Sequence, residues 1–342
     1  EPPRAAMPAP APARPSVPPP VEAAPAQKAT RRFISPRARA LANNKCIDPS
    51  PITGTGPNGR VVEKDVLAYL ETRGYDRLRI TPAARQTAAS EGLDILTVRG
   101  TGQGGRIMVR DVERALQARP RKLSKMRQTI ARRLSDSFRD IPHFYVTTSI
   151  DMTDLLAYRA ELKERGDAYK VTDFILEAVV LALGEYPVLN TVTDGMTARW
   201  NESVHLGLAV GLDDGLVVPP IRHAEELSLR ELGTQAADLS RRARDGSLMP
   251  DEMTGSTFTV SNMGMFDVEC FGAIINPGES GILAVASTVP TPVVRNAAVV
   301  VRQMMKITLS VDHRIVDGTT GAQFVNAVKA KLEDVELWKH LT

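Results

Sequence analysis

Residues 35–66, SPRARALANNKCIDPSPITGTGPNGRVVEKDV, return at residues 81–112 as TPAARQTAASEGLDILTVRGTGQGGRIMVRDV. The matching positions keep one offset of 46 residues, from 35 to 81, with no insertion or deletion. Self-similarity at a fixed spacing is the signature of a duplicated structural unit. The sequence therefore predicts two copies of one small module, at residues 33–72 and 79–118.

Each predicted copy consists of two short helices around a loop. Ser35 or Thr81 precedes a proline and an Ala-rich run, and a hydroxyl cap followed by proline suits the start of a helix. A turn-rich GTGxxGR loop follows, and Asp65 or Asp111 is predicted to cap the second helix. The predicted second helices are Val66–Leu70 and Val112–Leu116. So small a core favours a docking element over an enzyme.

The segment before the repeat has a different composition. Residues 1–30 are mostly Ala and Pro, which predicts an extended, semi-rigid tether. Composition alone is equally typical of a disordered tail without a role. Because the sequence starts at Glu1 inside this linker, we expect it to continue a longer polypeptide.

Overall composition limits the possible function classes. A chain of 342 residues predicts more than one domain, and a net charge of +3 gives no reason to expect a nucleic-acid partner. Cys46 and Cys270 lie too far apart to indicate a disulfide framework or a zinc site, and no metal is expected. No apolar run approaches the ~20 residues that span a bilayer, and the first residues do not show the basic-then-apolar pattern of a secretory signal. These features predict a soluble, intracellular protein with no membrane partner. The bacterial cytoplasm is the expected location, and the mitochondrial matrix stays open as the alternative.

From residue 121 the pattern changes to alternating strands and longer helices, which predicts an α/β domain over residues 121–342. The strand-like runs are Phe144–Ile150, Val204–Val210, Leu216–Ile221, Thr257–Ser261, Gly281–Ala286 and Lys306–Val311. The predicted helices are Ser124–Phe138, Thr153–Arg165, Thr172–Leu183, a helix from Ser228 to Arg244 and a final helix Ala322–Leu332. No glycine-rich nucleotide motif follows a strand, which disfavours nucleotide-binding folds.

Two strand ends carry side chains suited to acid–base chemistry. SVDHRIVDG, residues 310–318, puts His313 at the end of an apolar strand with Asp317 four residues later. An imidazole titrates near neutrality, and a nearby carboxylate can fix its tautomer, as abstraction of a thiol or hydroxyl proton requires. Ser261 ends another strand and can donate to a developing oxyanion. Taken alone, each pattern also fits an ordinary strand end, where Ser, Asn and Gly serve the backbone.

Together, the pieces resemble the dihydrolipoyl acyltransferase family of 2-oxo-acid dehydrogenase complexes, most of all the acetyltransferase branch of the pyruvate dehydrogenase complex. The repeat resembles its peripheral subunit-binding domain, and the Ala/Pro segment resembles its linkers. The motifs TFTVSNMG (257–264), AIINPGESGILAVAS (273–287) and SVDHRIVDG occur in the family's order. The resemblance covers nearly the whole chain.

The resemblance implies a chloramphenicol-acetyltransferase-like catalytic domain that forms trimers, from which cubic or dodecahedral cores are built. It implies that His313 is the general base on the thiol of coenzyme A, that Ser261 donates to the oxyanion and that Asp317 supports the histidine. The implied partners are dihydrolipoyl dehydrogenase and a 2-oxo-acid decarboxylase, gripped by basic residues of the modules. The matching arginines are Arg39, Arg60, Arg85 and Arg106.

Several alternatives stay open at this point. The transferred group is expected to be acetyl, with a succinyl or branched-chain group as the alternative. A non-catalytic scaffold that docks dehydrogenase subunits is a competing function, although a scaffold has no chemical need for His313 and Ser261. An antibiotic acetyltransferase would leave the two docking modules without a role. Because the sequence contains no lipoyl domain, the lipoyl group is expected upstream or on another protein.

Overall fold

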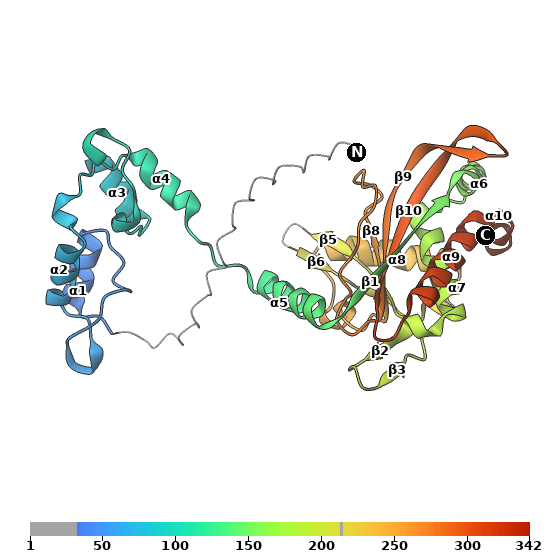
Figure 1. Cartoon of the computed structure of the whole chain (residues 1–342), viewed down its shortest axis with the longest axis horizontal. Helices are drawn as coiled ribbons and strands as arrows, with labels where there is room; N and C mark the ends of the chain where they lie inside the picture. Colours follow the sequence, from blue (N-terminus) through green and yellow to red (C-terminus); the bar gives the residue numbers. More distant parts are fainter. Residues whose placement is uncertain (1–32, 213–214) are drawn as a thin grey trace, which may run out of the picture. The chain divides into compact units, whose positions relative to one another are not determined.

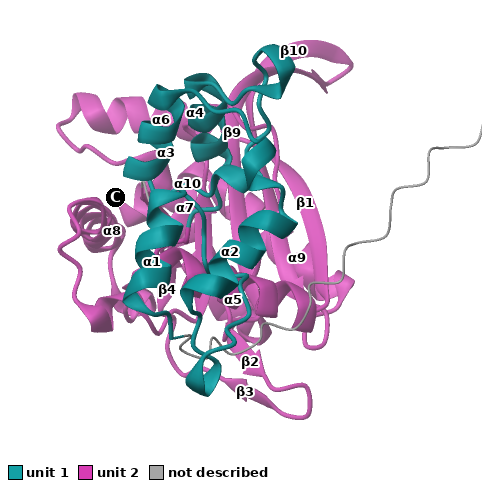
Figure 2. Cartoon of the chain, turned by 90° about the vertical axis from the view of Figure 1, so that its left-hand side faces the viewer, with its two compact units in different colours: residues 1–121 teal, residues 122–342 magenta. Residues whose placement is uncertain are grey.

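The computed structural model describes residues 33–212 and 215–342 and divides the chain into two compact units (Figures 1 and 2). Unit 1 is residues 1–121 and unit 2 is residues 122–342. Each has a hydrophobic core of its own. The predicted tether at residues 1–30 lies outside the described residues.

Unit 1 contains the duplicated module. Helices α1 (Pro36–Asn44) and α2 (Glu63–Thr72) form the first copy, and α3 (Pro82–Ser90) and α4 (Val109–Ala118) form the second. The predicted caps are confirmed, because the hydroxyls of Ser35 and Thr81 accept the backbone N–H groups of Ala38 and Ala84 at 3.2 and 3.3 Å. The 3-10 turns are η1 (Pro57–Gly59), η2 (Tyr75–Arg77), η3 (Ile95–Thr97) and η4 (Gln103–Gly105).

The predicted starts of the second helices are wrong. Helix α2 begins at Glu63 and α4 at Val109, so Asp65 and Asp111 lie inside the first turn. Each carboxylate reaches back to the backbone N–H just before its helix, at Val62 or Met108, and accepts two further bonds from the GTG threonine. The aspartates therefore stand at the third position of each helix, where they cap its start from inside and join it to the loop.

Unit 2 is built on a six-stranded mixed sheet in the order β1-β10-β9-β8-β4-β7. The strands are β1 (His143–Asp151), β4 (Leu206–Leu208), β7 (Pro220–Ile221), β8 (Phe258–Asn262), β9 (Gly281–Arg295) and β10 (Ala298–Asp312). Strand β8 runs parallel to β9 and β4, and the other pairings are antiparallel. Two-stranded sheets are formed by β2 (Thr191–Thr193) with β3 (Ala198–Trp200) and by β5 (Val210–Leu212) with β6 (Gly215–Val217).

The register gives the sheet two unlike faces. Val146, Leu309, Leu283 and Val260 are aligned across four strands, and most of this row belongs to the main core. The next row is Thr147, Thr308, Ala284 and Ser261, whose side chains point to the opposite face because alternate residues of a strand do so. Ser261 therefore lies on the more polar face of the sheet.

Helices complete unit 2. They are α5 (Lys125–Asp140), α6 (Thr153–Glu164), α7 (Val171–Glu185), α8 (Leu229–Arg244), α9 (Gly318–Glu333) and α10 (Val335–Leu341), with the turns η5 (Pro187–Asn190), η6 (Ala224–Glu226) and η7 (Pro250–Met253). Helix α7 packs against α8 and α9, and α9 packs on β1. Among the described residues, no helix has both the length and the apolar character needed to cross a membrane.

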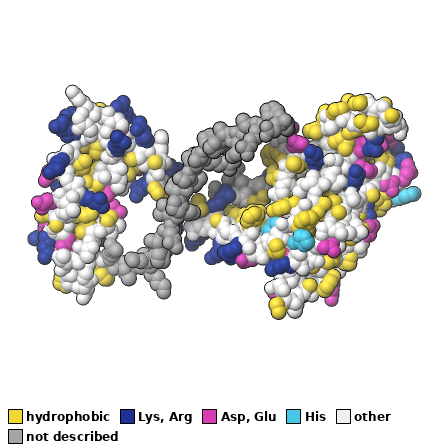
Figure 3. All heavy atoms as spheres, in the orientation of Figure 1, with side chains coloured by type: hydrophobic (Ala, Val, Ile, Leu, Met, Phe, Trp, Pro, Cys, Tyr) yellow, Lys and Arg dark blue, Asp and Glu magenta, His cyan; other side chains and the backbone are white. Residues whose placement is uncertain are grey.

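Three differences from the predicted elements stand out. The predicted strand Val204–Val210 is interrupted, with β4 and β5 in different sheets. Strands β9 and β10 extend beyond the predicted runs into a long hairpin, whose outer valines are largely exposed (Figure 3). Val294, Val299 and Val301 are 71%, 74% and 68% exposed. The predicted final helix is followed by α10, whose Trp338 is fully buried.

Candidate functional site

His313 lies in the turn that follows strand β10. Its backbone N–H donates to the carbonyl of Pro142 at 3.0 Å, which ties the turn to the start of β1. The imidazole is exposed, and it makes no hydrogen bond with the described residues. The ring of Phe144 meets it edge-on at a centroid distance of 4.8 Å. The imidazole nitrogens are therefore free to act on a bound substrate.

Asp312 and Arg314, the two neighbours of His313, hold the turn in place with an ion pair. Asp312 is buried, and its carboxylate accepts two parallel bonds from the Arg314 guanidinium, at 2.9 Å from Nε and 2.7 Å from Nη2. This ion pair raises the pKa of Arg314. Bidentate pairs of this kind fix geometry as well as charge. The sequence alone assigns this pair no role, although both residues stand inside the quoted motif.

Gly318 makes room for the aromatic wall of the site. A Cβ atom at this position would lie 3.2 Å from Cε1 of Phe144, closer than most real Cβ contacts. A larger residue would displace the Phe144 ring, which contacts the ring of His313. The glycine of the motif is thus explained by packing against Phe144, which the sequence marks only as part of a strand.

Asp317 acts first on the backbone. Its carboxylate accepts the Thr320 N–H at 2.7 Å and caps helix α9. Hydrogen bonds from Thr320 lower the pKa of Asp317, and positive charge on His313 contributes a smaller lowering. No hydrogen bond joins Asp317 to the His313 ring within the described part of the chain. Asp317 therefore anchors the turn that carries His313 to the start of α9.

Ser261 lies near the end of β8 and is partly exposed. Its hydroxyl has no hydrogen-bond partner among the described residues. Two positions earlier on the same face, Thr259 donates to the buried carboxyl of Glu279 at 2.7 Å, and Ser256 and Asn276 donate to the same carboxyl. Burial raises the pKa of Glu279 against these bonds. The Glu279 cluster fixes β8 to the loop before β9, a role that the NPGES motif did not reveal.

One chain does not bring Ser261 and His313 together. The register sets Ser261 level with Thr308 of β10, two strands away. His313 is five residues further along, a separation of about 16 Å in the strand direction and about 10 Å across the sheet. A general base and an oxyanion donor must both lie within hydrogen-bond reach of one reacting group. These two residues cannot serve the same reacting group within one chain.

The four predicted docking arginines are all exposed. A parallel bridge pairs Ile34 with Val61 in the first copy, and the equivalent bridge pairs Ile80 with Ile107 in the second. In each copy the bridge joins the residue after the GTGxxGR loop to the residue two positions before the first helix. The arginine of the loop and the arginine of that helix therefore lie on adjoining segments: Arg39 with Arg60, and Arg85 with Arg106.

A possible metal-binding group appears at the surface of unit 2. His223, Glu225 and Glu226 have ligand atoms within 4.8 Å of one another, and all three residues are exposed. The His223 backbone N–H donates to Nδ1 of His205, which occupies that nitrogen of the neighbouring ring. Exposed groups of this kind are common without an ion.

Comparison with protein families agrees with this division. The model described as "2-oxoacid dehydrogenases acyltransferase (catalytic domain)" matches residues 116–339. The model described as "e3 binding domain" matches twice, at residues 32–67 and 78–113. Both parts of the chain thus have a family counterpart, and the duplication is recognised as two domains of one kind.

Curated relatives share most of the chain. A mitochondrial dihydrolipoyllysine-residue acetyltransferase component of the pyruvate dehydrogenase complex from Schizosaccharomyces pombe is 37% identical over 90% of this chain. The corresponding component of an acetoin cleaving system from Bacillus subtilis is 39% identical over 89% of it. The chain spans 62% of the first relative's length and 70% of the second's.

Solved structures are similar to unit 2. A probable dihydrolipoamide acetyltransferase from Listeria monocytogenes is 33% identical, with a TM-score of 0.61 over 66% of this chain and 97% of that one. The dihydrolipoamide acetyltransferase of Azotobacter vinelandii is 31% identical, with the same TM-score over 64% and 92%. The prediction of an α/β domain preceded in the sequence by small helical domains is confirmed. The chain therefore belongs to the 2-oxoacid dehydrogenase acyltransferase family and carries two subunit-binding domains ahead of its catalytic domain.

Proposed function

We propose that the chain transfers an acetyl group between a dihydrolipoyl thiol and coenzyme A, as the core component of a pyruvate dehydrogenase complex. The supporting observation is the free imidazole of His313 in a braced turn. Crystallographic and enzymatic work on the Azotobacter vinelandii enzyme concerns a serine, a histidine and an asparagine in its mechanism. The serine and histidine lie 52 positions apart and the asparagine follows four later, the spacings of Ser261, His313 and Asp317 here.

In this proposal His313 accepts the proton of the coenzyme A thiol. The sulfur attacks the acyl carbonyl of the S-acyldihydrolipoyl group, and Ser261 donates to the oxyanion that forms. As the carbon–sulfur bond to the dihydrolipoyl group breaks, His313 returns the proton to the leaving sulfur. Asp317 is a positioning residue, and it stands where the relative has its asparagine. A carboxylate here would stabilise the imidazolium more than an amide does.

The proposed site is completed by a second copy of the chain. The strand register separates His313 from Ser261 within one chain, so we propose that His313 of one copy works with Ser261 of its neighbour in a homotrimer. The exposed valines on the β9–β10 hairpin support self-association, because apolar surface of this extent favours burial. A related solved structure, 32% identical, is the cubic core of a pyruvate dehydrogenase multienzyme complex, and we propose assembly of the trimers into a larger core.

The first test is a steady-state assay with acetyl-, succinyl- and isobutyryl-coenzyme A and free dihydrolipoamide. The acetyl donor is expected to be preferred. His313→Ala should lower kcat by about 10²- to 10⁴-fold, because general base catalysis is lost. Ser261→Ala should lower it by about 10²- to 10³-fold, because one oxyanion donor is lost. Near-normal turnover of the assembled His313→Ala protein would refute the mechanism, and no transfer from any donor would favour the scaffold function.

Mixed assemblies test where the site forms. Neither His313→Ala nor Ser261→Ala chains contain both residues, so a site within one chain stays inactive after mixing. If the residues come from neighbouring chains, random reassembly of a 1:1 mixture should restore about one quarter of wild-type activity. Failure to recover activity in verified mixed trimers would place the site within one chain.

The remaining parts of the proposal concern partners and location. We propose that the subunit-binding domains dock dihydrolipoyl dehydrogenase and a 2-oxo-acid decarboxylase through their arginines, and that the lipoyl group is carried on sequence outside this chain or on another protein. The relatives include bacterial proteins and a mitochondrial one. A location in the bacterial cytoplasm stays a prediction.

A further inference from the structure

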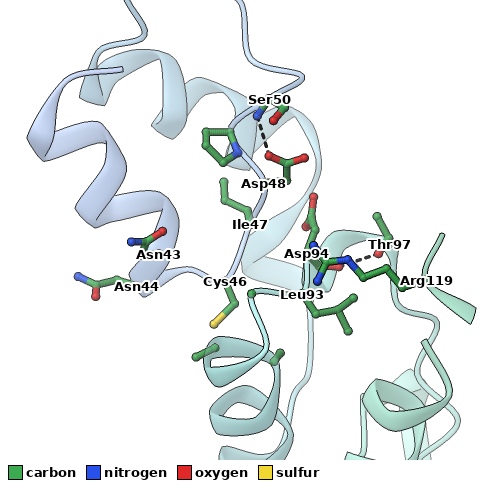
Figure 4. Close-up of a pocket in the computed structure, with 14 residues that line it drawn as sticks. Asn43, Asn44, Cys46, Ile47, Asp48, Ser50, Leu93, Asp94, Thr97 and Arg119 are labelled. Atoms are coloured by element: carbon green, nitrogen blue, oxygen red, sulfur yellow. Dashed lines mark hydrogen bonds between the residues drawn. The ribbon is translucent and has the colours of Figure 1, made fainter. Parts of the chain in front are cut away.

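The two copies of the docking module meet at the turn after helix α1. The carbonyl of Cys46 accepts the Ile95 N–H at 2.9 Å, and the Cys46 thiol donates to the Arg85 carbonyl at 3.8 Å. Figure 4 shows Cys46 at this turn, pointing toward the second copy, beside a hollow lined by residues of both copies. One continuous hydrophobic cluster runs through both copies. The two copies in unit 1 therefore share one core and are not two independently packed domains.

Tyr75, in the turn that connects the copies, closes the junction. It is only 7% exposed, and the ammonium of Lys45 lies 5.1 Å from the centre of its ring. Burial raises the pKa of both the Tyr75 hydroxyl and the Cys46 thiol, and the charge of Arg85 opposes both shifts. Arg85 also lines a second hollow together with the end of α1. Arg85 thus lies beside the junction, with an exposed side chain that makes no hydrogen bond or ion pair within the described residues.

The junction is one-sided, although the copies are homologous. The position equivalent to Cys46 is Gly92, and both have left-handed backbone, with φ of 52° and 58°. Gly92 is exposed and a Cβ there would touch nothing, whereas Cys46 is buried. The position equivalent to Ile95 is Pro49, which has no N–H to donate. The contacts that Cys46 of the first copy makes with the second copy therefore have no equivalents made by Gly92 of the second copy with the first.

Arg39, the arginine equivalent to Arg85, lines neither of the two hollows at the junction. Arg39 is exposed, and its guanidinium makes no hydrogen bond or ion pair within the described residues. Arg60, on the segment bridged to the start of α1, is exposed in the same way. Two unpartnered guanidinium groups on adjoining segments can each bind a carboxylate with two parallel bonds. A partner approaching Arg85 would meet the end of α1 as well.

This proposal rests on the docking role proposed above. We propose that the two copies are unequal: the first copy binds an acidic surface of the dehydrogenase through Arg39 and Arg60, and the second copy packs against the first copy and supports it. One partner then binds per tandem. Arg85 and Arg106 are also exposed in the second copy, but Arg85 lines a hollow beside the end of α1, so the first copy restricts a partner's approach to it. The duplication supplies a rigid support for one docking surface.

The test uses the full chain and purified dihydrolipoyl dehydrogenase in titration calorimetry at two salt concentrations. Arg39→Glu and Arg60→Glu should each weaken Kd by about tenfold or more, because a repulsive charge replaces an attractive one at the contact. The matched variants Arg85→Glu and Arg106→Glu should change Kd by less than about threefold. One dehydrogenase should saturate each tandem.

Three outcomes are distinguishable. Equal weakening by Arg39→Glu and Arg85→Glu, or saturation at two partners per tandem, would overturn the inequality and leave the docking role intact. No binding by the wild-type chain would overturn the docking role and the inequality together. Because Arg85→Glu can disturb the junction, Arg85→Gln is measured beside it, with hydrogen exchange over residues 33–118 as the fold control. A large loss of binding in Arg85→Gln with unchanged exchange would also refute the proposal.

Discussion

The first and second copies of the module share one internal framework but differ where they face each other. Inside each copy, an aspartate holds the GTG loop, at Asp65 and at Asp111, with the same three bonds. At the junction, Cys46 is buried and its equivalent Gly92 is open. Duplication thus preserved what folds each copy and changed what joins them, so equivalent substitutions should agree inside the copies and disagree at the junction.

The largest expected effect tests the shared framework. A Cβ at Gly54 would collide with the backbone of Gly59 and Arg60, and one at Gly100 would collide with that of Gly105 and Arg106. Gly54→Ala and Gly100→Ala should each destabilise their copy by about 3 kcal/mol, because backbone cannot move aside cheaply. Hydrogen exchange by mass spectrometry on the full chain measures each copy separately. Loss in only one copy would show that the frameworks are not equivalent.

Acid should weaken both copies. Backbone N–H groups of Met108 and Thr101 lower the pKa of Asp111 to about 2, and bonds from Thr55 and Val62 lower that of Asp65. Because each folded-state pKa is below the unfolded value, the stabilisation is present above about pH 4 and is lost as the pH falls toward 2. Pulsed hydrogen exchange against pH should show the loss, and Asp111→Asn should flatten it in the second copy alone. Unchanged acid sensitivity of the second copy in that variant would contradict the assignment.

The junction is where the copies should disagree. Gly92→Ala places a side chain at positive φ with no new contact, and should cost about 1 kcal/mol. Cys46→Gly relieves that strain but removes a buried side chain, so its net effect on stability should be smaller while exchange at Ile95 and Tyr75 rises. Equal exchange changes at the two positions would mean that Cys46 does not join the copies.

One substitution at the junction should give a gain in stability. The Tyr75 hydroxyl is buried with no partner among the described residues, and its equivalent, Arg121, is exposed. Tyr75→Phe should therefore stabilise unit 1 by about 1 kcal/mol, since an unsatisfied buried group is removed. Urea denaturation monitored by exchange in the second copy provides the measurement. Destabilisation would point to a hydrogen bond that Tyr75 makes in solution.

Features set by short-range sterics were predictable from the sequence, and features set by pairing were not. The caps at Ser35 and Thr81 depend on neighbouring residues, and so could be read directly. The hairpin beyond Ala286 was missed because Pro290 and Pro292 cannot donate to a ladder and end the strand signal. His313 was singled out as a candidate from its motif, but its separation from Ser261 depends on the register of three strands, which no local pattern contains. The repeat has Cys46 in the first copy and Gly92 at the equivalent position of the second. This difference is visible in the sequence and indicates that only one of the two positions makes a side-chain contact.

The missing N–H of Pro49 and the missing side chain of Gly92 also limit how long such an array can grow. For a third repeat to stack on the second as the second stacks on the first, Gly92 would have to supply the buried contact that Cys46 makes. It has no side chain with which to do so. The tandem therefore carries its own terminus: recombination that lengthened the gene by another 46-residue period would add a loosely tethered unit, not a longer rod.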